Sequence, residues 1–257
     1  MSIPPPPDVT KSTPLSQGIS VVRLMVQCGH SLGVTKLAEE LGMPKSSVHR
    51  LLITLQELGF VQKIEETKRY TLSADIFDFV HEIASHFGRN LSLDDRLRAA
   101  ASKLGVSVYL SMLGKRDTYV ICAAGDEGNT TKLGSHGRAY ATSAGKVLIA
   151  HLDEKEWSRR APPTEEKSIT PYTIRDPQKF FAQLREVKKT GIAWNRRESS
   201  KDHVSLATVV REPFIRQPRL AVAFLMRHEE LAMRDHKELE HALLKLAADL
   251  ERKLGRR

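Results

Sequence analysis

Cysteines, long apolar runs and metal-binding motifs are scarce or missing in this sequence, and each absence excludes a class of protein. The two cysteines, Cys28 and Cys122, show no CxxC or Cys/His spacing, which argues against a disulfide framework and a structural zinc site. The apolar runs Val204–Val210 and Leu220–Met226 are far shorter than the roughly 20 residues that span a bilayer. Neither HxxxH nor HExxH occurs. We therefore expect no metal, no cofactor and no membrane partner.

The N-terminal segment 1–14 is polar and rich in proline, and it contains no apolar run that would serve as a signal peptide. We expect it to be a disordered tail on a soluble, cytoplasmic protein. With 257 residues and 40% hydrophobic content, the chain is long enough for two domains that each bury a core. The formal net charge of +9 is compatible with a nucleic-acid partner, but net charge says nothing about the fold.

Two helices separated by a tight turn are predicted by segment 33–61, which reads GVTKLAEELGMPKSSVHRLLITLQELGFV. Gly42 ends the first of these helices and Pro44 opens the second, and a short helix over 17–28 precedes both. This is helix-turn-helix spacing. The second helix has one apolar stripe that must face a core, formed by Val48, Leu51, Leu52, Leu55 and Leu58.

A helix-turn-helix places the start of its second helix in the major groove of DNA, where Arg and Lys read guanine and Ser contacts phosphate. The strand-like runs 60–64 and 68–72 follow as a hairpin, which is typical of a wing. The wing favours DNA binding over the alternative of an ordinary helical hairpin with a solvated polar face. The predicted DNA-binding side chains are Thr35, Lys45, Ser46, Ser47, His49 and Arg50 on the helices, and Lys63, Lys68 and Arg69 on the wing.

An amphipathic segment over 74–90 predicts a linker helix, so the winged helix-turn-helix domain is expected to occupy 15–73. Segment 91–257 alternates strand-like and helical patterns, which predicts an α/β or α+β domain. Its helices are expected to begin after the caps Ser92, Thr142, Asp153 and Asp176. Its strands are expected at 106–112, 119–124, 192–195, 204–210 and 220–226.

The segment 134–152, GSHGRAYATSAGKVLIAHL, has superficial features of two catalytic motifs. A phosphate-binding loop needs Gly where Tyr140 stands and Ser or Thr where Val147 stands, so that motif fails. A nucleophile elbow at Ser143 needs a buried strand before it, and the preceding residues are polar and rich in glycine. The remaining interpretation is a helix that starts with small residues. Its free N–H groups and helix dipole would hold a carboxylate, and the alternative is that this helix start simply packs on a sheet.

Three stretches in this order resemble the IclR family of bacterial transcriptional regulators: segment 33–61, YATSAGKVLIAHL at 140–152, and ITPYTIRDPQKFFAQLREVKKTGIAWN at 169–195. The resemblance implies an α+β chain with an N-terminal winged helix-turn-helix, a linker helix, and a C-terminal GAF-like effector-binding domain with an antiparallel sheet over 91–257. It also implies three partners, which are double-stranded promoter DNA, a small-molecule effector and further copies of the chain in a homodimer or tetramer.

The resemblance further implies an effector pocket. Its residues in this sequence would be Met112, Ser143, Ala144, Asn195, Ser205, Phe224 and Met226. Ser205 stands where the family commonly has Cys, and Asn195 stands where Asp is usual. Phe224 and Met226 replace small hydroxyl residues, which favours an aromatic or bulky acid as the effector.

We therefore expect a ligand-responsive, sequence-specific DNA-binding regulator of a catabolic operon, with a small, aromatic carboxylate effector and no enzymatic activity. Two alternatives stay open, namely a serine-dependent acyl-transfer enzyme with an accessory winged helix, and a constitutive DNA binder without an effector. The charge does not decide among them. Residues 1–90 contain 9 basic and 9 acidic residues, while 91–257 contain 31 and 22, so the excess lies outside the DNA-binding segment. This excess favours an anionic effector or a surface without function.

Overall fold

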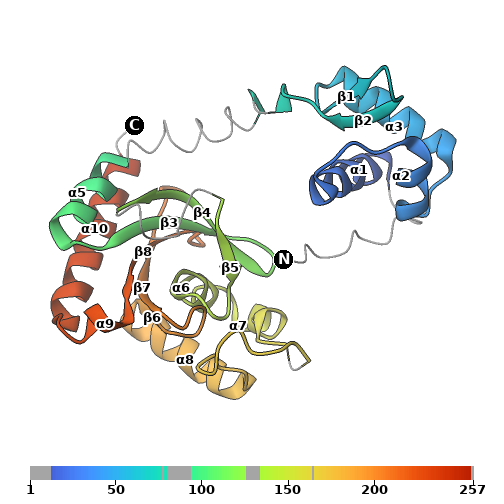
Figure 1. Cartoon of the computed structure of the whole chain (residues 1–257). Helices are drawn as coiled ribbons and strands as arrows, with labels where there is room; N and C mark the ends of the chain where they lie inside the picture. The colour runs from blue at the N-terminus through green and yellow to red at the C-terminus, as the bar shows by residue number, and fades with distance from the viewer. Residues whose placement is uncertain (1–12, 77, 80–93, 126–133, 164, 256–257) are drawn as a thin grey trace. The chain divides into compact units, whose positions relative to one another are not determined.

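The computed structural model describes residues 13–76, 78–79, 94–125, 134–163 and 165–255, and the chain divides into two compact units, Met1–Ala84 and Ser85–Arg257 (Figure 1). The predicted tail lies almost entirely outside the described residues, and most of the predicted linker helix and the cap at Ser92 do so as well.

The first unit consists of three helices followed by a hairpin. Its elements are α1 (Pro14–Cys28), α2 (Val34–Leu41), α3 (Lys45–Glu57), β1 (Val61–Ile64) and β2 (Arg69–Leu72). α1 begins at Pro14, inside the segment predicted as a tail, because the Thr13 side chain caps it and Pro is favoured in a first helical turn. Gly42 adopts a φ of 61° at the end of α2, which frees the chain to turn into α3.

The core of the first unit forms where α1, α2, α3 and the hairpin meet. Val48, Leu52 and Leu55 of α3 are buried in it, as the periodicity predicts. Leu58 was also placed on this stripe, and that prediction is wrong, because Leu58 follows the last helical residue and its side chain is 64% exposed. The hairpin pairs Val61 with Leu72 in antiparallel register, so the predicted wing is present.

The second unit is built on an antiparallel sheet, six-stranded within the described residues, with the strand order β5-β4-β3-β8-β7-β6. The strands are β3 (Ser107–Leu113), β4 (Asp117–Ala124), β5 (His136–Arg138), β6 (Ile192–Arg196), β7 (His203–Val210) and β8 (Leu220–Arg227). The short strand β5 was not predicted, because three residues that include a glycine carry no readable alternation. The predicted α+β fold is confirmed.

Helices cover both faces of this sheet (Figure 1). They are α5 (Asp94–Leu104), α6 (Ser143–Ala150), α7 (Glu154–Trp157), α8 (Pro177–Thr190), α9 (His228–Leu231) and α10 (His236–Leu254), with the 3-10 turn η2 (Ser158–Arg160). The leucines of α10 pack with α5 against one face, and α6 and α8 pack against the other. Every residue of α6 is buried, so this helix forms the centre of its layer.

Capping side chains mark the starts of α6, α8 and α10 in the second unit. Thr142 caps α6 through a bond from the Gly145 N–H, and Asp176 caps α8 through the N–H of Gln178. Both caps were predicted. Asp153 stands at the start of α7, but its side chain makes no capping bond. The short α7 instead begins with a backbone bond from Glu156 to the Asp153 carbonyl.

Candidate functional site

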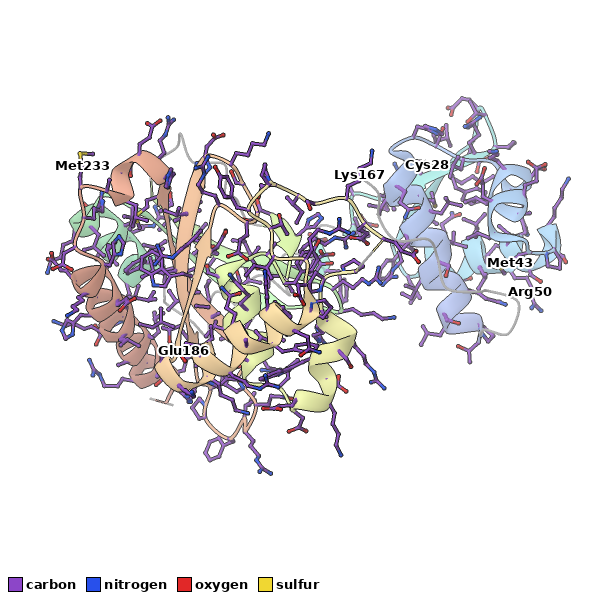
Figure 2. All side chains as sticks on the ribbon, turned by 90° about the horizontal axis from the view of Figure 1, so that it is seen from below. Cys28, Met43, Arg50, Lys167, Glu186 and Met233 are labelled. Carbon is purple, nitrogen blue, oxygen red and sulfur yellow. The ribbon has the colours of Figure 1, made fainter. Side chains whose placement is uncertain are left out.

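The first turns of α3 form a polar, exposed surface on the first unit. Lys45, Ser46, His49 and Arg50 are exposed there, whereas Ser47 is half-buried. Arg50 lies on the outer side of the helix (Figure 2). Among the described residues no side chain caps the start of α3, so none of them competes with an incoming phosphate for the first backbone N–H groups. Thr35 is exposed at the start of the neighbouring α2.

The three basic residues predicted for the wing already have partners within the unit. Lys63 and Lys68 both approach the Glu65 carboxylate, with N–O distances of 3.0 and 2.7 Å. Lys68 and Glu65 are exposed, so these pairs exchange readily for an outside anion. Arg69 differs, because its guanidinium donates to both the carbonyl and the hydroxyl of Ser31 and ties the hairpin to the loop after α1.

A cavity of about 200 Å³ opens on the α6 side of the sheet in the second unit. Hydroxyl groups dominate its wall, together with two histidines and a few apolar side chains. The lining residues are Tyr109, Ser111, Thr118, Val120, Ser135, His136, Gly137, Thr142, Asn195, Ser199, Ser200, His203, Ser205 and Leu225. They come from the sheet strands, from the start of α6 and from the loop between β6 and β7.

Three hydroxyls meet at one side of the cavity, where Tyr109 and Ser205 line the wall, whereas the fully buried Ser143 is not among the lining residues. The Oγ atoms of Ser143 and Ser205 are 2.8 Å apart, and the Tyr109 hydroxyl bonds to both serines. Burial raises the pKa of Tyr109, so the phenol stays protonated and available as a donor. Of these residues, Ser143 and Ser205 were predicted and the structure brings them together.

Ser111 contributes a hydroxyl that has no partner. Its side chain lines the cavity, is 1% exposed, and its Oγ makes no hydrogen bond within the described part of the chain. A buried hydroxyl without a hydrogen bond costs about 1–3 kcal/mol. This cost is removed when a polar ligand group enters the cavity and bonds to Ser111.

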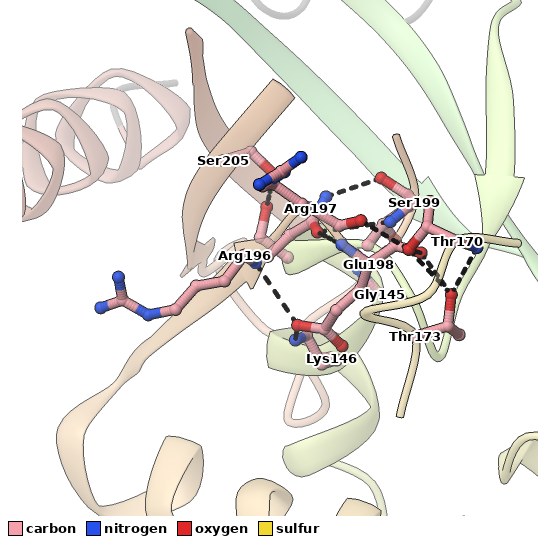
Figure 3. Close-up of polar contacts among 12 residues, drawn as sticks. Gly145, Lys146, Thr170, Thr173, Arg196, Arg197, Glu198, Ser199 and Ser205 are labelled. Carbon is pink, nitrogen blue, oxygen red and sulfur yellow. Dashed lines mark hydrogen bonds and ion pairs between the residues drawn. The ribbon is translucent and has the colours of Figure 1, made fainter. Parts of the chain in front are cut away.

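Asn195 lines the cavity and holds its neighbouring loop. Its Oδ1 accepts the backbone N–H of Glu198 at 2.7 Å, and its Nδ2 donates to the Ser199 hydroxyl at 2.6 Å. From the other side, the hydroxyls of Thr170 and Thr173 donate to the carbonyls of Arg197 and Glu198 (Figure 3). This network fixes Ser199 and Ser200 at the cavity wall.

A buried ion pair completes the support of this loop. The Nζ atom of Lys146, in the middle of α6, lies 2.5 Å from Oε1 of Glu198, and the lysine side chain is 0% exposed (Figure 3). Burial lowers the pKa of Lys146, and the facing carboxylate opposes that shift. The Oε2 atom of Glu198 is buried without a hydrogen-bond partner among the described residues. The pair connects α6 directly to the cavity loop.

Met112, Phe224 and Met226 do not reach the cavity. They pack in the apolar layer beneath α5 and α10, on the opposite face of the sheet. Successive residues of a strand alternate between faces, so a shift of one position in assigning the strand reverses the face of every side chain. The cavity-lining residues are their neighbours Ser111 and Leu225. Ala144 also misses the cavity and packs in the core around α6.

Sequence reasoning missed several wall residues besides Ser111 and Leu225. Ser199, Ser200 and His203 follow Asn195 closely, so their proximity to it was the available signal. His136 comes from the unpredicted strand β5 and stacks on Tyr119 at a ring distance of 5.6 Å. No Lys or Arg lines the cavity within the described residues, so the basic excess of this unit is not located there.

Two negative findings apply to the described part of the chain. It contains no group of three or more His, Cys, Asp or Glu residues arranged to hold a metal ion. No helix in that part has the length and apolar character needed to cross a bilayer.

Comparison with known proteins gives matches along most of the chain. The family model for the IclR helix-turn-helix domain matches residues 14–65, and the model for the C-terminal part of the bacterial transcriptional regulator IclR matches residues 90–252. The transcriptional repressor IclR of Escherichia coli is 26% identical over 215 residues, which cover 78% of this chain and 76% of that protein. The regulator TtgV of Pseudomonas putida is 25% identical over 246 residues, covering 94% and 92%.

A solved structure shows the same fold. It is an IclR homologue from Microbacterium hydrocarbonoxydans in complex with 4-hydroxybenzoate, which superimposes with a TM-score of 0.74 at 13% identity and covers 95% of this chain and 100% of its own. The two family models together match most of the chain, and the chain belongs to the IclR family of bacterial transcriptional regulators.

Proposed function

We propose that this regulator reads double-stranded promoter DNA with the start of α3. The exposed residues Lys45, Ser46, His49 and Arg50 supply base-edge and phosphate contacts, with Thr35 on α2 adding a phosphate contact. Ser47 is half-buried on the same helix and its backbone N–H donates to the Pro44 carbonyl at 3.0 Å, so its partly exposed hydroxyl is the group that contributes. The uncapped helix start supports this assignment, because its free N–H groups suit a phosphate.

On the wing, Lys63 and Lys68 are the proposed backbone contacts. They exchange the Glu65 carboxylate for DNA phosphate at small cost, because exposed ion pairs contribute about 1 kcal/mol or less. Arg69 has the different role of holding the wing on the loop at Ser31. We therefore remove Arg69 from the set of DNA contacts.

The effector in this proposal is a small aromatic hydroxy acid that enters the hydroxyl-lined cavity. The unpartnered hydroxyl of Ser111 is the observation that carries the proposal, because it marks a polar contact that the protein alone does not make. Thr142 lies at the start of α6, where the helix dipole favours a carboxylate. The flat ring of His136 and the apolar side chain of Leu225 suit an aromatic body. The neighbour solved with 4-hydroxybenzoate supports the same class.

Calorimetric titration of the full chain with 4-hydroxybenzoate tests this assignment. We expect saturable binding that Ser111→Ala weakens about tenfold, since a hydrogen bond of about 1.4 kcal/mol is lost. The matched control is Ser158→Ala, which removes an exposed hydroxyl far along the chain and should leave binding unchanged. Tight binding of glyoxylate with no binding of any aromatic acid would overturn the aromatic class.

The cavity also bears on the enzyme alternative. Ser143 is fully buried, and the recorded partners of its hydroxyl among the described residues are the hydroxyls of Ser205 and Tyr109. A serine nucleophile needs a neighbouring general base, and neither partner is one. We therefore assign Ser143 the role of supporting the cavity residues Ser205 and Tyr109, and we assign the chain no enzymatic activity. Ester hydrolysis that Ser143→Ala abolishes would reverse this assignment.

We further propose a cytoplasmic homodimer or tetramer. Leu15, Ile19 and Val26 are exposed apolar side chains of α1 at helical spacing, and a second copy of the chain would cover them. The effector then acts by binding one arrangement of the DNA-reading units more tightly than another. Sedimentation of the full chain measures its oligomeric state, and a monomer at micromolar concentration would contradict the proposed dimer or tetramer.

A further inference from the structure

Four arginines gather around a small cavity on the second unit, separate from the effector cavity. They are Arg116 from the turn between β3 and β4, Arg138 at the end of β5, and Arg159 and Arg160 from the turn η2. Glu166 is the acidic residue among the described residues that line this cavity, and Tyr140 and Pro163 complete much of the wall. Part of the basic excess of residues 91–257 is therefore concentrated at one place.

Arg159 pairs with Glu156 at 3.1 Å, while the other three guanidinium groups are only loosely neutralised within the described residues. Arg160 donates to the backbone carbonyls of Gly114 and Lys115 at 2.5 and 3.1 Å, which fixes its position without offsetting its charge. Arg138 lies 3.4 Å from Asp117 and 3.5 Å from Glu166. A strong guanidinium–carboxylate bond is about 2.7–2.9 Å long, so these contacts leave donor capacity unused.

Glu166 shows where an oxyanion fits. One of its carboxylate oxygens lies between the guanidinium groups of Arg116 and Arg138, at 3.8 and 3.5 Å. The Glu166 side chain is 38% exposed and belongs to a loop, so it can leave without opening the core. Tyr140 adds a further donor, because burial and the nearby Glu166 carboxylate raise the pKa of its phenol and keep it protonated.

We propose that this arginine cavity binds a phosphate group, either as free phosphate or as a phosphate monoester, which displaces the Glu166 carboxylate. Planar guanidinium groups bind phosphate oxygens in pairs, and a dianion neutralises the cluster better than the single charge of Glu166 does. The cavity is open and has a volume of about 30 Å³, and departure of the Glu166 carboxylate adds room for the charged group, while the remainder of a larger ligand lies outside, beside the exposed Arg159.

The position of the cavity links it to the effector site. Arg138 pairs with Asp117 in the register of β4 and β5, and the next pair along the same strands is Gly137 with Thr118. Gly137 and Thr118 line the effector cavity. A phosphate at Arg138 therefore acts on the strands that form the effector-cavity wall.

Calorimetric titration of the full chain with sodium phosphate and with glycerol 3-phosphate, at constant ionic strength in a phosphate-free buffer, tests the proposal. We expect saturable binding that Arg116→Gln weakens at least tenfold. Arg116 is exposed and pairs only weakly with Glu166, at 3.8 Å, so this variant should fold normally. Glu166→Gln should tighten binding severalfold, because it removes the competing carboxylate at nearly unchanged size.

Lys189→Gln is the matched control, since it removes an exposed positive charge on α8, away from the cavity, and should leave binding unchanged. Tighter binding of the ester identifies a monoester and equal binding identifies free phosphate, and both results support the site. The proposal fails if wild type and Glu166→Gln show no saturable binding of either probe, or if Arg116→Gln and Lys189→Gln weaken binding equally. It also fails if Arg116→Gln loses affinity for duplex DNA while its affinity for both small phosphates stays unchanged.

Discussion

Lys146 places an ammonium group in the interior of the second unit, where Glu198 is its ion-pair partner. Removing one member of a buried pair leaves the other charge uncompensated and costs about 3–5 kcal/mol. We expect Lys146→Met to lower the unfolding free energy by that amount. Both tryptophans, Trp157 and Trp194, lie in the second unit, so urea unfolding followed by tryptophan fluorescence measures its stability.

The double variant Lys146→Met/Glu198→Leu separates the charge from the packing. Replacing both charges by apolar side chains is often neutral or stabilising, so the double variant should recover most of the loss. The exposed Lys189→Met serves as the control and should change stability by less than about 0.5 kcal/mol. If the single and double variants were equally destabilised, the pair would not be the source of the effect.

His151, the residue after α6, predicts a pH dependence of stability. Burial lowers its pKa in the folded chain below the ordinary value of 6.5, and the nearby cations Arg211 and Lys188 add to this, while a bond to the Val147 carbonyl opposes it. As the pH falls below 6.5, the unfolded chain therefore takes up the proton first. The contribution of neutral His151 to stability is complete above pH 6.5 and is lost as the pH falls through the folded pKa.

Urea unfolding at several pH values between 7 and 5 measures this contribution. The wild type should lose stability as the pH falls, and His151→Asn should show a smaller loss over the same range, because Asn does not titrate. Parallel curves for the two proteins would show that other groups cause the pH dependence.

At the scale of single elements, α6 depends on a glycine. A Cβ atom on Gly145 would lie 2.0 Å from the carbonyl oxygen of Ala139, and because that oxygen belongs to the backbone it cannot move aside cheaply. Gly145→Ala should therefore cost about 3 kcal/mol or more of unfolding free energy. It should also displace α6 from the cavity, so that effector binding falls with stability.

Gly255→Ala is the matched control in the same unit. Gly255 has a φ of −81°, and an added Cβ would make only ordinary contacts. The midpoint temperatures of thermal unfolding of the two variants should therefore differ by many degrees. A Gly145→Ala protein with wild-type stability would show that α6 and residue 139 are less closely packed than described.

The strands show what the sequence could and could not predict. The five predicted strands match β3, β4, β6, β7 and β8 within two residues at each end, and β7 and β8 coincide with the two apolar runs of the sequence. The face of each side chain was not predictable, because a strand covered by helices on both sides is apolar at almost every position and shows no alternation. Met112, Phe224 and Met226 were therefore assigned to the cavity in place of Ser111 and Leu225.

Helix starts were more predictable than the cavity. Caps such as Thr142 and Asp176 act within a few residues, so local sequence is enough to place them. The cavity depends on contacts between distant segments. The bond between Ser143 and Ser205 spans 62 positions, and the arginine cavity joins a strand turn to η2. Contacts between such distant segments cannot be predicted from sequence spacing alone.

At the scale of the whole molecule, the two units divide the work of an IclR-family regulator between DNA reading and effector binding. Residues 1–90, which include the whole first unit, have no net charge, so the DNA affinity of that unit must come from the local arrangement at α3. Arg50 is the proposed base-reading side chain of that surface. The removal of one such contact costs about 1–3 kcal/mol and relaxes sequence preference.

The most direct test is the DNA affinity of Arg50→Ala measured by fluorescence anisotropy, with a labelled duplex from the region upstream of the gene and a random duplex as control. The account predicts that the variant binds the upstream duplex at least tenfold more weakly than wild type, while it binds the random duplex and 4-hydroxybenzoate almost as well. Wild-type affinity of Arg50→Ala for the upstream duplex would contradict it.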